Sequence, residues 1–155
     1  MNILILCTGN SARSIIGEAL VSAQDGFTGF SAGSTPQGEP HPMALNILHE
    51  KGHDVSGFRS KSWDEFGRDD APNMDVIITV CDNAAGEACP YWPGHPVVAH
   101  WGLPDPAAVE EMNFQRAAFE TTYEELKKRV DALAALPLAD MNAADRKAAV
   151  QGVHG

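Results

Sequence analysis

One short segment of the chain carries residues whose types and spacing suit chemistry on an oxyanion. A cysteine and an arginine, separated by five residues, lie in the run CTGNSARS from Cys7 to Ser14. A loop of this length can wrap so that successive backbone N–H groups face one anion, while the arginine fork binds two of its oxygens. We expect the anion-binding loop to comprise Thr8, Gly9, Asn10, Ser11, Ala12, Arg13 and Ser14.

Cys7 is the candidate nucleophile of this loop, because it would lie directly beneath a bound tetrahedral anion. Backbone N–H donors, the positive end of a following helix and the Arg13 guanidinium all favour a thiolate over a thiol. The sequence therefore predicts a Cys7 pKa below the ordinary value for cysteine. The alternative is a purely structural one, in which Cys7 is a small buried side chain and Arg13 a surface charge.

Two further cysteines, Cys81 and Cys89, lie far along the chain with seven residues between them. Three thiols are too few and odd in number for a disulfide framework, so they are available for chemistry. Inert buried thiols are one alternative. A zinc site with His95 and His100 is another, but structural zinc sites favour cysteine pairs two to four residues apart.

Asp105 is a candidate proton donor, since it stands between two prolines that stiffen the backbone presenting it. A leaving oxygen needs a proton, and a carboxylic acid close to the anion can supply it. The alternative is that Asp105 is a turn residue, a position that aspartate often takes between prolines.

Strands that alternate with helices position these residues. Short apolar or β-branched runs predict strands, and three-to-four spacing of apolar residues predicts helices. We expect strands over 2–6, 27–33, 75–80 and 96–101, and helices from Ser11 to near Asp25, over 42–51 and over 112–135.

This order predicts an α/β fold, in which a four-stranded parallel sheet is flanked by helices in a single three-layer domain over residues 1–136. Residues 137–155 form an Ala-rich tail, helical or disordered. Parallel sheets bind ligands at the carboxyl ends of their strands. Because Cys7, Cys81 and the 101–105 loop each follow a predicted strand, we expect them to converge at one edge.

Charge and composition exclude several kinds of partner. The chain has 155 residues, with 11 Lys and Arg against 21 Asp and Glu, so its formal net charge is −10. Such a chain does not attract nucleic acid or an anionic membrane surface. No apolar run approaches the roughly 18 residues of a membrane span. The start MNILILCTGN lacks the pattern of a secretion signal, so we expect a reduced, cytoplasmic protein.

Three motifs in order, CTGNSARS, SAG at 31–33 and WGLPDPA at 101–107, resemble the low-molecular-weight protein tyrosine phosphatase superfamily, and most closely its arsenate reductase branch. The resemblance implies that Cys7 attacks phosphorus or arsenic, that Arg13 binds the oxyanion and that Asp105 is the general acid. The phosphatases usually place aromatic residues after the Asp-Pro pair, where this chain has Ala107 and Ala108. The loop position before the arginine, commonly cysteine, is alanine here. A small substrate such as arsenate, with phosphate or sulfate as analogues, is the better fit.

The same resemblance implies a thiol relay. Cys7 attacks arsenate, Cys81 attacks the adduct and expels arsenite, and Cys89 resolves the Cys7–Cys81 disulfide. The resulting Cys81–Cys89 disulfide then needs an external reductant, either thioredoxin or glutaredoxin with glutathione. The thioredoxin-linked branch usually has six residues between the last two cysteines, whereas this chain has seven. A reductase in which glutathione or mycothiol attacks the arsenic adduct therefore remains an alternative.

The resemblance also implies a cation, because some thioredoxin-linked members bind potassium beside the loop. The matching positions carry oxygen ligands and are Asn10, Glu18, Ser31 and Asp64. The leading hypothesis is thus an arsenate reductase. The alternatives are a phosphatase that hydrolyses phosphate monoesters through a phosphocysteine, and a non-catalytic domain that binds an oxyanion or a partner.

Overall fold

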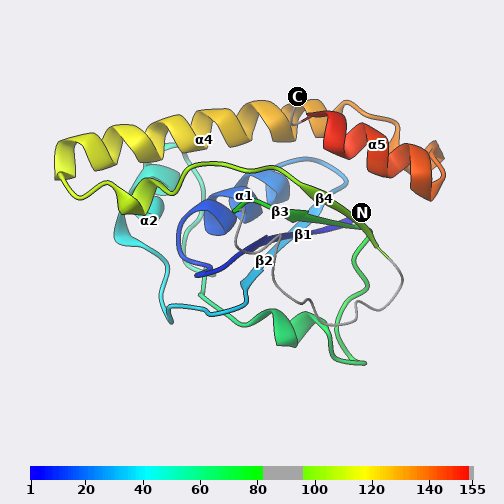
Figure 1. Cartoon of the computed structure of the whole chain (residues 1–155), viewed down its shortest axis with the longest axis horizontal. Helices are drawn as coiled ribbons and strands as arrows, with labels where there is room; N and C mark the ends of the chain where they lie inside the picture. The colour runs from blue at the N-terminus through cyan, green and yellow to red at the C-terminus, as the bar shows by residue number, and fades with distance from the viewer. Residues whose placement is uncertain (82–95, 154–155) are drawn as a thin grey trace.

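The computed structural model describes residues 1–81 and 96–153. Its strands and helices follow one another in the predicted order (Figure 1). The strands are β1 (Asn2–Cys7), β2 (Thr28–Gly33), β3 (Val76–Thr79) and β4 (Val97–His100). The helices are α1 (Arg13–Ser22), α2 (Pro42–Glu50), α4 (Met112–Ala134) and α5 (Ala143–Val153), with short 3-10 turns η1 (Trp63–Phe66), η2 (Pro106–Ala108) and η3 (Leu138–Asp140).

The predicted four-stranded parallel sheet is confirmed, with strand order β2-β1-β3-β4. The two central strands, β1 and β3, are buried on both faces, which explains why β1 reads as a continuous hydrophobic run. Ile3 and Ile5 pack under the helices, whereas Leu4 and Leu6 pack against η1 on the other face. Figure 1 shows α1, α2, α4 and α5 on one side of the sheet and η1 on the opposite side.

The segment after residue 137 contains α5, which closes the exposed edge of the sheet beside β4. The Gln151 side chain pairs with the His100 backbone like a neighbouring strand: Oε1 accepts from the His100 N–H at 2.8 Å, and Nε2 donates to the His100 carbonyl at 2.7 Å. Trp101 is fully buried, and its Nε1 donates to the Val150 carbonyl at 2.9 Å. These bonds satisfy backbone groups that an edge strand would otherwise expose.

Backbone pairing continues beyond the carboxyl ends of the inner strands and brings their loops together. The Val80 N–H donates to the Leu6 carbonyl at 2.9 Å, and the Leu103 N–H donates to the Val80 carbonyl at 3.1 Å. The segments after β1, β3 and β4 therefore meet at one edge of the sheet, as predicted. Among the residues that the structure describes, no helix is long and apolar enough to cross a membrane.

Gly33 joins the end of β2 to the segment that follows β1. A Cβ atom at this position would meet the backbone of that segment, contacting the carbonyl of Thr8 and lying 3.0 Å from both the Asn10 nitrogen and the Cys7 carbonyl oxygen. Only glycine permits this close approach, because backbone atoms cannot move aside as a flexible side chain does. The glycine of the SAG motif is thus required for the strand and the loop to pack together.

We predict that Gly33→Ala lowers the free energy of unfolding by about 2 kcal/mol, because the added methyl group forces the loop backbone away from β2. Denaturant unfolding followed by circular dichroism measures the change. Gly57→Ala is the matched control, since a Cβ atom at Gly57 meets nothing within 4 Å. Equal stability of the two variants would show that the contact does not constrain the loop.

Candidate active site

The loop between β1 and α1 is held in shape by the side chain of Asn10, which is fully buried. Asn10 adopts the left-handed backbone conformation, with φ of 45°, which asparagine tolerates better than most residues. Its Nδ2 donates to Ser14 Oγ at 2.8 Å and to Ser31 Oγ at 3.0 Å. Its Oδ1 accepts from the Lys61 backbone N–H at 2.9 Å. All three bonds fix the turn of the loop.

The carbonyl groups of the loop are bonded outward to the surrounding segment. Backbone N–H groups donate to three of them: Thr35 to Thr8 at 2.9 Å, Gln37 to Gly9 at 3.0 Å and His41 to Ser11 at 2.8 Å. In a trans peptide the N–H of the next residue points away from the carbonyl. The N–H groups that follow these three carbonyls are therefore directed into the loop, as an anion cradle requires.

Helix α1 begins directly behind the loop. Its N-cap is Ala12, whose side chain makes no capping hydrogen bond, so the first N–H groups of the helix are not covered by a cap. Arg13 is the first residue of the helix, and its side chain is only 13% exposed. Within the described residues, the buried Arg13 Nε has no hydrogen-bond partner. An oxyanion in the loop would satisfy this donor and lie at the positive end of the helix.

The loop that follows β4 brings Asp105 to the same place. Arg13 Nη1 donates to the Leu103 carbonyl at 2.9 Å, and its Nη2 lies 3.8 Å from Asp105 Oδ2. Asp105 Oδ1 accepts from the Ala107 N–H at 3.0 Å, which caps the short turn η2. The carboxyl group is 45% exposed and can exchange protons with water. Arg13 and Asp105, 92 residues apart in the sequence, thus meet in the fold.

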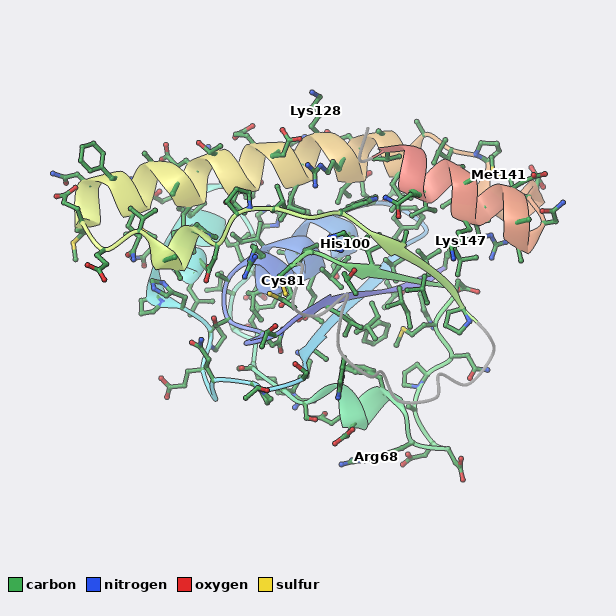
Figure 2. The ribbon with its side chains drawn as sticks, viewed as in Figure 1. Arg68, Cys81, His100, Lys128, Met141 and Lys147 are labelled. Carbon is green, nitrogen blue, oxygen red and sulfur yellow. The ribbon has the colours of Figure 1, made fainter. Side chains whose placement is uncertain are left out.

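Cys81 lies against the loop at the end of β3. Its sulfur accepts from the Thr8 N–H at 3.3 Å and lies 3.4 Å from Thr8 Oγ1. Cys7 and Cys81 are both buried free thiols, and a hydrogen bond joins their side chains. Figure 2 shows Cys81 in the interior of the molecule. The structure therefore places a second thiol within reach of the first.

The neighbouring thiol corrects the expectation for the pKa of Cys7. The hydrogen bond to Cys81 raises the pKa of Cys7 above its ordinary value, and burial raises it further. The Arg13 guanidinium and the Thr8 N–H lower it, but they do not outweigh the first two causes. The sequence placed Cys81 at the same edge of the sheet, but the pKa expectation for Cys7 considered only the positive groups of the loop and not a hydrogen bond from a second thiol. Cys89 and His95 lie outside the described residues, so the structure does not place them.

The residues expected to hold potassium do not fit that ion. Asn10 turns its Nδ2, a donor, toward Ser31, while its oxygen is used by the Lys61 backbone. Ser31 Oγ donates to Glu18 Oε1 at 2.5 Å. The ammonium group of Lys61 lies 3.6 Å from Glu18 Oε1 and 3.5 Å from Ser31 Oγ, so a protein cation already neutralises the carboxylate. Asp64 is exposed on η1.

Lys61 is a residue of this site that the sequence analysis missed. Its side chain is only 8% exposed, and burial lowers its pKa, an effect that the Glu18 carboxylate opposes. Nζ also donates to the Arg59 carbonyl at 2.9 Å. The run RSK carries no signal for this role, because the partners of Lys61 come from β2 and α1. Lys61 and Glu18 both contact the Ser31 hydroxyl, which in turn accepts a hydrogen bond from Asn10.

Comparison with known proteins identifies the family of this chain. The chain matches the low molecular weight phosphotyrosine protein phosphatase family over residues 2–147. It is 34% identical to an arsenate reductase of Bacillus licheniformis over 131 residues, covering 83% of this chain and 91% of that protein. It is 38% identical to an arsenate reductase of Brevibacillus brevis over 120 residues, covering 76% of this chain and 86% of that protein.

Solved structures agree with the sequence matches. An arsenate reductase in the phosphate binding state aligns with a TM-score of 0.63 and 25% identity, over 84% of this chain and 96% of that chain. A thioredoxin-dependent arsenate reductase of Corynebacterium glutamicum aligns with a TM-score of 0.55 and 28% identity, over 84% of this chain and 61% of the other. Because the family match spans nearly the whole sequence, this chain belongs to the low molecular weight phosphotyrosine protein phosphatase family.

Proposed function

We propose that the protein is an arsenate reductase that uses Cys7 and Cys81 to convert arsenate to arsenite. The observation that carries this proposal is the position of Cys81. Its sulfur accepts a hydrogen bond from the Thr8 N–H, and its side chain is hydrogen-bonded to the Cys7 thiol. Phosphate-ester hydrolysis needs only one cysteine, because water resolves its covalent intermediate. Reduction of arsenic from +5 to +3 needs two electrons, which two neighbouring thiols supply together when they form a disulfide.

The first step forms the adduct. Arsenate enters the loop, where inward N–H groups, the amino end of α1 and Arg13 bind its oxygens. Cys7 sulfur attacks arsenic, a sulfur–arsenic bond forms and one arsenic–oxygen bond breaks. The departing oxygen leaves as water with two protons, one that hydrogenarsenate already carries and one from Asp105. The thiol proton of Cys7 then replaces the proton that Asp105 has given up. Arsenic remains in its +5 state.

The second step transfers the electrons. Cys81 sulfur attacks the sulfur of the Cys7–arsenic adduct, so the Cys7–Cys81 disulfide forms and the sulfur–arsenic bond breaks. The bonding pair leaves with arsenic, which becomes arsenite in its +3 state, and the Cys81 proton goes to solvent or product. Two thiols are oxidised for each arsenate reduced. The buried contact between Cys7 and Cys81 means that this step needs little movement of either residue.

The third step restores the thiols. In our proposal Cys89 attacks Cys81 and releases Cys7, and thioredoxin then reduces the Cys81–Cys89 disulfide. The thioredoxin-dependent relative supports this choice of reductant. Glutathione with glutaredoxin, or mycothiol, is the alternative donor. Because each donor belongs to a reducing compartment, we infer that the enzyme works in the cytoplasm.

A phosphatase is the second candidate, because Cys7, Arg13 and Asp105 also meet the needs of phosphate-ester hydrolysis. The chain nevertheless has Ala107 and Ala108 on η2, directly after the Asp-Pro pair, where an aromatic leaving group would be held. Their methyl groups offer little surface to an aromatic ring. The site thus favours a small inorganic substrate over a phosphotyrosine side chain.

We predict that Cys81→Ser lowers arsenate turnover at least about 100-fold with thioredoxin, because serine oxygen cannot form the disulfide. Arsenite production with thioredoxin, thioredoxin reductase and NADPH measures this loss. Phosphate protection against thermal unfolding is the control, and it should persist because the loop and Arg13 are intact. Undiminished turnover of Cys81→Ser with glutathione would instead assign the second step to a small thiol. Hydrolysis of phosphate monoesters by the parent protein, without arsenate reduction, would favour the phosphatase.

We also predict that Cys81→Ala lowers the pKa of Cys7. The substitution removes the largest cause that raises this pKa, while Arg13 continues to lower it. The thiolate fraction near neutral pH therefore rises in the variant. The measurement is the rate of Cys7 alkylation by iodoacetamide against pH, followed by mass spectrometry of the Cys7 peptide. The midpoint of that profile should move to lower pH, and an unchanged midpoint would contradict the assigned cause.

A further inference from the structure

The loop that carries Asp105 crosses a hollow on the surface of α4. The hollow has a volume of about 500 Å³ and is lined by residues of both the loop and the helix. Its lining is mostly apolar and includes Leu103, Pro104, Pro106, Val109, Ala118 and Thr122. Leu103 and Ala107 pack against the core, but the hollow leaves part of the space beneath the loop unfilled, so polar contacts can contribute to the position of the loop.

Arg129 makes one of these contacts from the wall of the hollow. It is buried on α4, with only 8% of its surface exposed, although arginine is rarely buried without a role. Its Nη1 donates to the Gly102 carbonyl at 3.4 Å, and its Nη2 pairs with Glu125 Oε1 at 3.2 Å. Within the described residues, its buried Nε has no hydrogen-bond partner. The guanidinium is thus committed to the loop and to one carboxylate.

Arg13 holds the next carbonyl of the same loop. Its Nη1 donates to the Leu103 carbonyl at 2.9 Å, from the amino end of α1. Two guanidinium groups on different helices therefore hold two consecutive carbonyls at the start of the loop. Arg13 is also expected to bind the oxyanion, so its hydrogen bond to the Leu103 carbonyl competes with hydrogen bonds to the oxyanion. Among the contacts that the structure describes, Arg129 binds only the Gly102 carbonyl and Glu125 and is not part of the anion-binding loop.

We propose that Arg129 is a positioning residue, which holds the Gly102 carbonyl so that Asp105 stays beside Arg13 while the oxyanion is bound. The proposal rests on the proposed function, since it gives Asp105 the role of proton donor. Pro104 and Pro106 restrict the backbone on either side of Asp105, so a displacement at Gly102 is passed along the loop. Without Arg129, the loop can move over the hollow, and the carboxyl group leaves the geometry that proton transfer needs.

The test compares Arg129→Gln with Arg129→Lys and with Lys128→Gln as the matched control. Lys128 is the neighbouring cation on α4, and Figure 2 shows its side chain pointing away from the rest of the fold. Two quantities are measured for each protein. The first is the single-turnover rate of arsenite formation against arsenate concentration, and the second is amide hydrogen exchange of the peptide covering residues 102–109.

We expect Arg129→Gln to lower the maximal single-turnover rate about 10-fold and to change the half-saturating arsenate concentration less than about 2-fold, because proton transfer depends on Asp105 whereas binding does not. Exchange in residues 102–109 should rise, while exchange in β1 and β3 stays the same. Arg129→Lys should recover part of the rate, since an ammonium group can still donate to the Gly102 carbonyl. Lys128→Gln should match the parent protein in both measurements.

Three results would overturn the proposal. The first is an unchanged rate and unchanged exchange in Arg129→Gln. The second is an equal loss of rate in Lys128→Gln, which would point to helix charge alone. The third is a general rise in exchange over α4 and the sheet, which would make Arg129 a stability residue. If the parent protein fails to reduce arsenate, the proposed function fails, yet exchange in residues 102–109 still decides whether Arg129 holds the loop.

Discussion

The backbone of the loop between β1 and α1 can face an anion only while its carbonyl groups are bonded elsewhere. Asn10 makes this possible, because its buried side chain bonds Ser14, Ser31 and the Lys61 backbone and holds the left-handed turn. Backbone N–H groups of the segment after β2 then donate to the outward carbonyls. Gly33 allows the two segments to approach closely. The cradle, the position of Cys7 and the start of α1 all depend on this arrangement.

Local charges at the site outweigh the net charge of the chain. With a formal charge of −10, the protein as a whole repels a dianion. Arg13, the uncapped end of α1 and the inward N–H groups provide attraction over a short range, where it is strongest. The Lys61–Glu18 pair stands behind the loop and adds no net charge. Burial and the hydrogen bond with Cys81 raise the pKa of Cys7, and the free protein holds the two cysteines as neighbouring free thiols.

The two sides of the site are held differently. Cys7 is the last residue of β1, Cys81 follows β3, and both belong to the core cluster that contains α1, so their separation is set by core packing. Asp105 lies on a loop above a hollow, where arginines from two helices hold the backbone. This difference suits the two tasks. Thiol exchange needs a fixed approach of sulfur to sulfur, whereas a proton donor must allow substrate to enter and water to leave.

Apolar periodicity and motif order determined the strand and helix order, the parallel sheet and the convergence of Cys7, Cys81 and Asp105, because the carboxyl ends of parallel strands share one edge. Helix α5 carried too weak a pattern to be assigned, since it is stabilised by bonds to His100 and Trp101. The buried contacts of Lys61 and Arg129 were decided only by tertiary structure. Their partners lie far away in the sequence, and burial and hydrogen bonding, which also reversed the expected pKa shift of Cys7, depend on which distant groups the fold brings together.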